Sequence, residues 1–146
     1  MKPHMKYIPL SLLLFFVLSC VEPGGKISFN NNKEVIRSLF EAYNNHDWAT
    51  VAGCYADSTL FLDASLGDSA IYQTQEATIK RYQALHQKYP DMKAEIKDIY
   101  SDGNHVIVEF VAVGTARNSQ MKLAQCAVFT LKDGKIVENN TYFERK

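Results

Sequence analysis

Asp63 is a carboxylate at the end of a predicted strand, a residue type that can perform acid–base chemistry if it faces a cavity. It closes the stretch Thr59–Asp63, whose pattern predicts a short strand with Phe61 and Asp63 on one face. Burial in an apolar cavity disfavours the charged form of a carboxyl group, which suits such a group to proton transfer. The alternative is a strand-end aspartate that hydrogen-bonds the backbone of the loop 64–69. The sequence leaves both roles open.

Aromatic and polar residues fall on the faces of the predicted elements that would surround Asp63. The residues we expect to contact a ligand are Tyr43, Tyr55, Phe61, Asp63, Tyr82, Phe110, Gln125, Phe129, Thr141 and Phe143. A mainly aromatic lining with a few polar groups suits a small apolar or aromatic molecule. The alternative is that the same aromatic residues fill a solid core.

The cysteines and histidines give little sign of a metal or cofactor. Cys54 and Cys126 are the cysteines left once Cys20 is set aside, and we expect two small buried residues rather than a disulfide framework. His46, His86 and His105 lie on different predicted elements, without the spacing of metal ligands. We therefore predict no metal site and no cofactor.

The order of the elements predicts an α+β domain. Helical spacing appears after Asn32, again from Trp48 with Tyr55 on the same face, and across 74–89, where Pro90 ends the helix. Four strands follow, over 93–100, 105–115, 121–132 and 135–144. Asp-Gly pairs in two of the turns favour hairpins. We expect three N-terminal helices packed on a curved antiparallel sheet.

The strand over 105–115 is apolar on both faces. Val106, Val108, Phe110 and Ala112 alternate with Ile107, Val111 and Val113. One set can meet the helices, whereas the other needs a separate cover. A second copy of the chain is the simplest cover, so we predict a homodimer formed through the sheet.

The N-terminal segment predicts export and lipid attachment. Lysines precede an apolar run too short to span a bilayer, and the run ends in Val17-Leu18-Ser19-Cys20, which resembles the lipobox of bacterial lipoproteins. We expect a signal peptide over 1–19, palmitate or a related acyl chain on Cys20, a flexible tether over 20–32 and one domain over 33–146. The alternative is an ordinary secretory signal that happens to contain a cysteine. The prediction places the chain on the membrane of the bacterial cell envelope, facing the periplasm or the cell surface.

The charge balance argues against nucleic acid as a partner. The whole chain has 16 basic and 16 acidic residues. The charged residues within 1–19 are two lysines, so their removal leaves a slight excess of acidic residues. No basic surplus then remains to replace the counterions of a phosphate backbone.

Short stretches spread over Val35–Glu144 carry a family resemblance. They are Phe40–Trp48, Tyr55–Asp57, Tyr89–Met92, Gly114–Thr115, Val128–Ile136 and Tyr142–Glu144. In this order and spacing they resemble the nuclear transport factor 2-like superfamily, and within it the polyketide cyclase-like (SnoaL-like) branch. The resemblance implies a cone-shaped domain whose sheet and helices enclose a pocket. The same scaffold serves enzymes and pure binding modules, so it leaves the function open.

The resemblance also allows a test of known catalytic sets. Asp63 aligns with the general base of ketosteroid isomerase-like members, but Leu39 occupies the position of the oxyanion-hole tyrosine and Ala127 or a neighbour that of the acid. Loss of one such donor costs on the order of a hundred- to a thousand-fold in rate. The epoxide hydrolase-like set would need an acid near Thr141, and the cyclase-like histidine is absent where Ala116 stands. We expect a lipid-anchored domain that binds a small hydrophobic ligand. The alternative is an isomerase, cyclase or dehydratase with Asp63 as general base.

Overall fold

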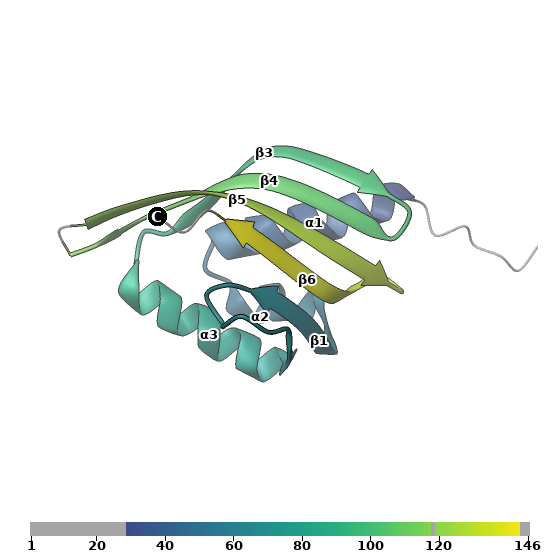
Figure 1. Cartoon of the computed structure of the whole chain (residues 1–146), viewed down its shortest axis with the longest axis horizontal. Helices are drawn as coiled ribbons and strands as arrows, with labels where there is room; N and C mark the ends of the chain where they lie inside the picture. The colour runs from purple at the N-terminus through teal and green to yellow at the C-terminus, as the bar shows by residue number, and fades with distance from the viewer. Residues whose placement is uncertain (1–28, 118, 144–146) are drawn as a thin grey trace, which may run out of the picture.

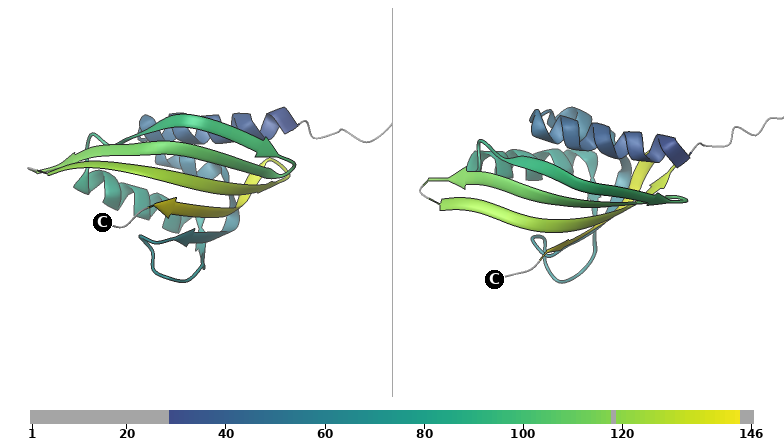
Figure 2. Two further views of the ribbon diagram at one scale, coloured as in Figure 1. Left: turned by 45° about the horizontal axis from the view of Figure 1, so that its top comes forward. Right: turned by 90° about the horizontal axis from the view of Figure 1, so that it is seen from above.

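The chain folds into three helices against one face of a curved sheet, as the sequence predicted (Figures 1 and 2). The sheet has six strands, one more than predicted. This is seen in a computed structural model that describes residues 29–117 and 119–143. The elements are α1 (Phe29–Asn44), α2 (Trp48–Gly53), β1 (Tyr55–Asp63), β2 (Ile71–Thr74), α3 (Gln75–Lys88), β3 (Lys93–Asp102), β4 (His105–Ala116), β5 (Ser119–Lys132) and β6 (Lys135–Phe143).

The strands follow the order β2-β1-β6-β5-β4-β3. From β3 to β6 the sheet is the predicted antiparallel meander, and β1 joins its β6 edge in parallel. The β3–β4 and β5–β6 turns fall at the Asp-Gly pairs. Gly103 has φ of 58°, while Asp133 and Gly134 have φ of 51° and 75°, which is the left-handed region that such turns require.

Two details of the region around β1 differ from the prediction. Tyr55 begins β1 and is not part of a helix, because α2 ends at Gly53 after 6 residues. The Ile136 amide donates to the Cys54 carbonyl over 2.9 Å, which ties the start of β1 to β6. The strand β2 was not predicted at all. It is an exposed four-residue edge strand that depends on pairing with β1.

The N-terminal boundary also moves. The helix α1 begins at Phe29, so the last four residues of the predicted tether are helical. Asn32 is buried, and its side chain donates to the Gly103 carbonyl over 3.3 Å, which fixes this turn of α1 against a hairpin. Cys20 and the predicted signal peptide lie outside the described residues.

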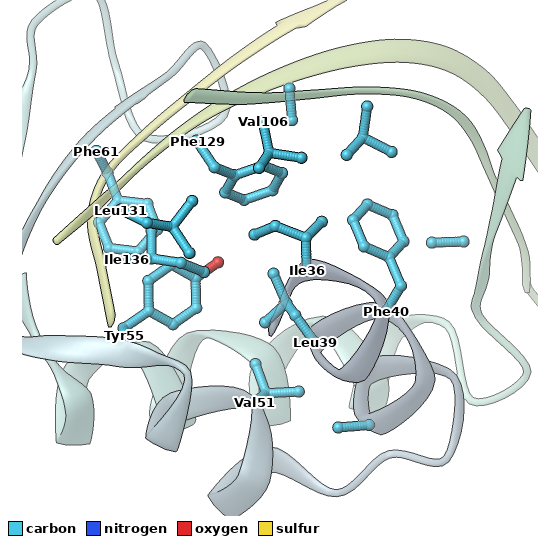
Figure 3. Packing of buried hydrophobic residues seen from close by; sticks show 14 of the residues in the cluster. Ile36, Leu39, Phe40, Val51, Tyr55, Phe61, Val106, Phe129, Leu131 and Ile136 are labelled. Carbon is cyan, nitrogen blue, oxygen red and sulfur yellow. The ribbon is translucent and has the colours of Figure 1, made fainter. Parts of the chain in front are cut away.

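The core lies between α1 and the concave face of the sheet (Figure 3). Val106 and Val108 of β4 are fully buried there, whereas Ile107 on the other face is 38% exposed. The Phe40 ring of α1 meets the Phe110 ring edge to face, with centroids 5.1 Å apart. The predicted alternation of β4 is therefore confirmed, and its second apolar face points away from the helices.

Candidate functional site

A cavity of about 480 Å³ lies between the concave face of the sheet and helices α1 and α3. All the predicted ligand-contacting residues except Phe61 line it: Tyr43, Tyr55, Asp63, Tyr82, Phe110, Gln125, Phe129, Thr141 and Phe143. The lining residues range from fully buried, such as Tyr55 and Phe129, to exposed, such as Ser65 and Lys88. The cavity therefore runs from the interior to the surface.

Phe61 lies behind the cavity wall. It is 1% exposed, and the centroid of its ring lies 5.2 Å from that of Tyr55. Figure 3 shows the two rings side by side. The Arg81 guanidinium covers the Phe61 ring at 4.7 Å. Phe61 thus supports two residues that reach the cavity, rather than lining it.

Asp63 lies at the end of β1, on the cavity wall. Its Oδ1 accepts a hydrogen bond from the Ser65 amide over 2.8 Å, so the loop contact considered from the sequence is present. Its Oδ2 lies 3.5 Å from Arg81 Nη1, and the two side chains are only 17% and 18% exposed. A structural role and a role toward a ligand are therefore compatible in this geometry.

Arg81 is the site residue that the sequence analysis missed. It lies on α3 between the rings of Phe61 and Tyr82, with its guanidinium carbon 4.7 Å from each ring centroid. Burial lowers the pKa of Arg81, but the neighbouring Tyr82, Tyr55 and Asp63 raise it by more. The pKa therefore lies above its usual value, and the side chain is charged. Helical spacing could have revealed it, because Arg81 follows the buried Thr78 by three residues and precedes Leu85 by four.

Hydrogen bonds link three residues of the cavity wall. Thr141 donates to Asn139 Oδ1, and Asn139 Nδ2 donates to the Tyr55 hydroxyl, each over 3.1 Å. Burial, followed by the neighbouring Tyr82, raises the pKa of Tyr55 well above its usual value. Burial likewise raises the pKa of Tyr43, whose hydroxyl lies 3.5 Å from Met92 Sδ. Both tyrosines are therefore neutral hydroxyl groups at physiological pH.

The positions aligned with an isomerase oxyanion hole are apolar in space as well as in sequence. Leu39 and Ala127 both line the cavity and carry no hydrogen-bond donor in their side chains. Tyr55 and Gln125, the possible substitutes, line the same cavity. The hydrogen-bond donors of this cavity therefore come from other positions than those of the isomerase pattern.

The helix α3 is fixed at both ends, which holds Arg81 and Tyr82 in place. Thr74 Oγ1 caps its start by accepting from the Ala77 amide over 3.2 Å. Beyond its end, Asp91 Oδ1 accepts from the Thr115 amide over 2.6 Å. Gly114 lies so close to this loop that a Cβ there would be 3.2 Å from Tyr89 Cβ.

Two histidines that the sequence places far apart meet beside this site. The centroids of the His46 and His86 rings lie 4.2 Å apart, and His46 Nε2 forms a hydrogen bond with the Met92 carbonyl over 3.0 Å.

Within residues 29–117 and 119–143, no group of three or more His, Cys, Asp or Glu side chains could hold a metal ion. Cys54 and Cys126 are free thiols. No helix in the described part of the chain is long and apolar enough to cross a membrane.

Solved structures of low sequence identity share the fold. IdmH from Streptomyces antibioticus, a proposed polyketide cyclase, matches with a TM-score of 0.68 and 24% identity over 77% of this chain and 91% of its own. An LEH-like epoxide hydrolase from M. tuberculosis matches with a TM-score of 0.68 and 21% identity over 79% of this chain and 84% of its own. A Catenulispora acidiphila protein with a ketosteroid isomerase-like fold, solved with trimethylamine, matches with a TM-score of 0.68 and 13% identity over 76% of this chain and 85% of its own.

The sequence itself identifies the family. Among curated proteins no sequence matches the chain significantly. The family model of the SnoaL-like domain, however, matches residues 36–139, which is most of the chain and includes all but two of the residues that line the cavity, Thr141 and Phe143. This chain belongs to the SnoaL-like domain family, which has the nuclear transport factor 2-like fold.

Proposed function

We propose that this domain binds a small, mainly apolar molecule in the cavity between the sheet and helices α1 and α3. The observation that supports this most is a cavity of about 480 Å³ with an aromatic lining and a few convergent polar groups. Cavities of roughly 300–1,000 Å³ with this kind of lining are typical of small-molecule sites. Its open side gives such a molecule a route in.

A thermal-shift screen tests this proposal. Steroid-like, polyketide-like, naphthalene-based and short fatty-acid ligands are added to the protein in turn. A ligand present at a hundredfold its Kd adds about 2.7 kcal/mol to the free energy of unfolding, so at least one class should raise the Tm clearly. Failure of every class to stabilise the fold would contradict the proposal.

A second candidate function is proton transfer by Asp63 in an isomerase, cyclase or dehydratase. It is supported by the position of the Asp63 carboxylate on the cavity wall beside a charged arginine. Asn at this position keeps an acceptor for the Ser65 amide but cannot act as a base. For a substrate that the protein turns over, we expect Asp63→Asn to abolish turnover while leaving binding and the Tm nearly unchanged. An unchanged rate would reject this role.

We further propose that the domain acts at the membrane surface of the cell envelope. The support is the sequence Val17-Leu18-Ser19-Cys20, with the cysteine as the acylated residue. In bacterial cells, the wild-type protein should sediment with membranes and Cys20→Ser should not. Equal membrane association of the two would count against acylation.

A further inference from the structure

The charged residues on the cavity wall carry a surplus of positive charge. They are Arg81 and Lys88 of α3 and Asp63 of β1. Arg81 and Lys88 are seven residues apart, so they lie on the same face of the helix, with Ala84 and Leu85 between them. An electrostatic field of this sign favours an anion over a cation of the same size.

The neutral polar groups on the wall are also arranged as donors. The bonds run from Thr141 to Asn139 and from Asn139 to the Tyr55 hydroxyl. Burial and the neighbouring Tyr82 raise the pKa of Tyr55, so this hydroxyl is neutral. It accepts from Asn139 Nδ2 and keeps its own hydrogen to donate. Tyr82 is adjacent to Arg81 in the chain and lines the same cavity.

Arg81 is held in place but is incompletely paired. The two rings at 4.7 Å fix the plane of the guanidinium. Its contact with Asp63 is 3.5 Å, longer than the 2.7–2.9 Å of a charge-assisted hydrogen bond, and the carboxylate already accepts from the Ser65 amide. An additional oxygen acceptor can therefore bind the Nη atoms without first breaking a short hydrogen bond.

We propose that the natural ligand of this cavity carries a carboxylate that binds beside Arg81 and the Tyr82 hydroxyl, with its apolar body toward Phe110 and Phe129. This inference rests on the proposed binding function and narrows its ligand to small apolar or aromatic acids. Bidentate pairing of a carboxylate with an arginine is among the stronger contacts in proteins.

Three compounds with the same ring system test the inference. They are 2-naphthoate, 2-naphthamide and 2-naphthylmethylamine, which are anionic, neutral and cationic at neutral pH. Titration calorimetry on the full chain should give the acid at least about a tenfold lower Kd than the amide, since hydrogen bonds to charged groups are worth about 1.5–3 kcal/mol. The amine should bind more weakly than the amide.

Variants of Arg81 test whether this residue causes the preference for the acid over the amide. Arg81→Gln should remove the acid-over-amide preference, whereas Arg37→Gln, at an exposed arginine of α1, should leave it unchanged. Arg81→Lys keeps the charge without the planar fork, so it should retain a reduced preference and keeps the test valid if Arg81→Gln unfolds. Equal binding of acid and amide by the wild type, or an undiminished preference in Arg81→Gln, would overturn the inference while leaving the binding function intact. Binding of none of the three compounds would instead argue against the binding function itself.

Discussion

Arg81 restricts the chemistry that Asp63 can perform. One carboxylate oxygen of Asp63 faces the guanidinium and the other accepts from the Ser65 amide. A substrate proton would have to approach a carboxylate whose oxygens both already face a donor. This geometry suits recognition of a ligand group at Arg81 at least as well as proton abstraction by Asp63.

The sequence predicted most of this site but not its cation. Strand alternation placed Asp63, Gln125, Phe129 and Thr141 on the cavity side, because period-two spacing fixes the face of each strand residue. Strand alternation could not show that Phe61 lies behind the cavity wall, because Phe61 and the wall residue Asp63 share one face of β1. Arg81 was missed because a charged residue on a helix is ordinarily taken as solvated.

The buried tyrosines should ionise only when the protein unfolds. Tyrosine in an unfolded chain has a pKa of about 10, whereas burial raises the pKa of Tyr43 and Tyr55 in the folded state. Because the folded values lie above the unfolded ones, the stability linked to these groups is complete below about pH 10 and is lost as the pH rises further. We expect phenolate absorbance to rise in two phases, the second coinciding with loss of the circular dichroism signal.

Tyr55→Phe should reduce that second phase by one tyrosine and leave the first unchanged. A single ionisation step near pH 10, with the fold intact, would contradict this assignment.

At the scale of elements, the predicted helices and meander formed where the local signals were strong. The helix α3 ends before Pro90, and the β3–β4 and β5–β6 hairpins turn at Asp-Gly pairs. The errors lie around β1, because Tyr55 fits both a helical face and a strand. The short strand β2 exists through its pairing with β1 in the folded chain, which no local pattern of residues 71–74 shows.

The cap at Thr74 should contribute measurably to stability, because it closes the first turn of the helix that carries Arg81 and Tyr82. Its Oγ1 accepts from the Ala77 amide, and loss of such a cap costs about 1 kcal/mol. In chemical denaturation we expect Thr74→Ala to lower the free energy of unfolding by about this amount, while Thr74→Ser keeps the acceptor and loses far less. Equal losses in the two variants would show that the hydroxyl does not act as a cap.

At the scale of the whole molecule, no helix or strand of the described residues covers the outer face of the sheet. Tyr100 of β3, Ile107 of β4 and Tyr142 of β6 are 50%, 38% and 52% exposed. With the intervening β5, these strands form one continuous part of the sheet. We propose that a second copy covers this face, as the alternation of β4 suggested.

Analytical ultracentrifugation tests the dimer. The wild type should sediment as a dimer and Ile107→Lys as a folded monomer, because a lysine there would be buried without a partner. Tyr72→Lys, at a 73% exposed residue of the edge strand β2, is the matched control and should remain dimeric. A monomeric wild type would contradict the proposal.

The central claim is that the interior cavity receives a ligand, and filling that cavity tests it most directly. Ala127 is 1% exposed on β5 and lines the cavity, whereas Ala49 is exposed on α2. With the best ligand from the thermal-shift screen, titration calorimetry should show one saturable site per chain in the wild type and in Ala49→Leu. Ala127→Leu should keep the circular dichroism spectrum of the fold and lose the site. Undiminished binding by a folded Ala127→Leu would contradict the account.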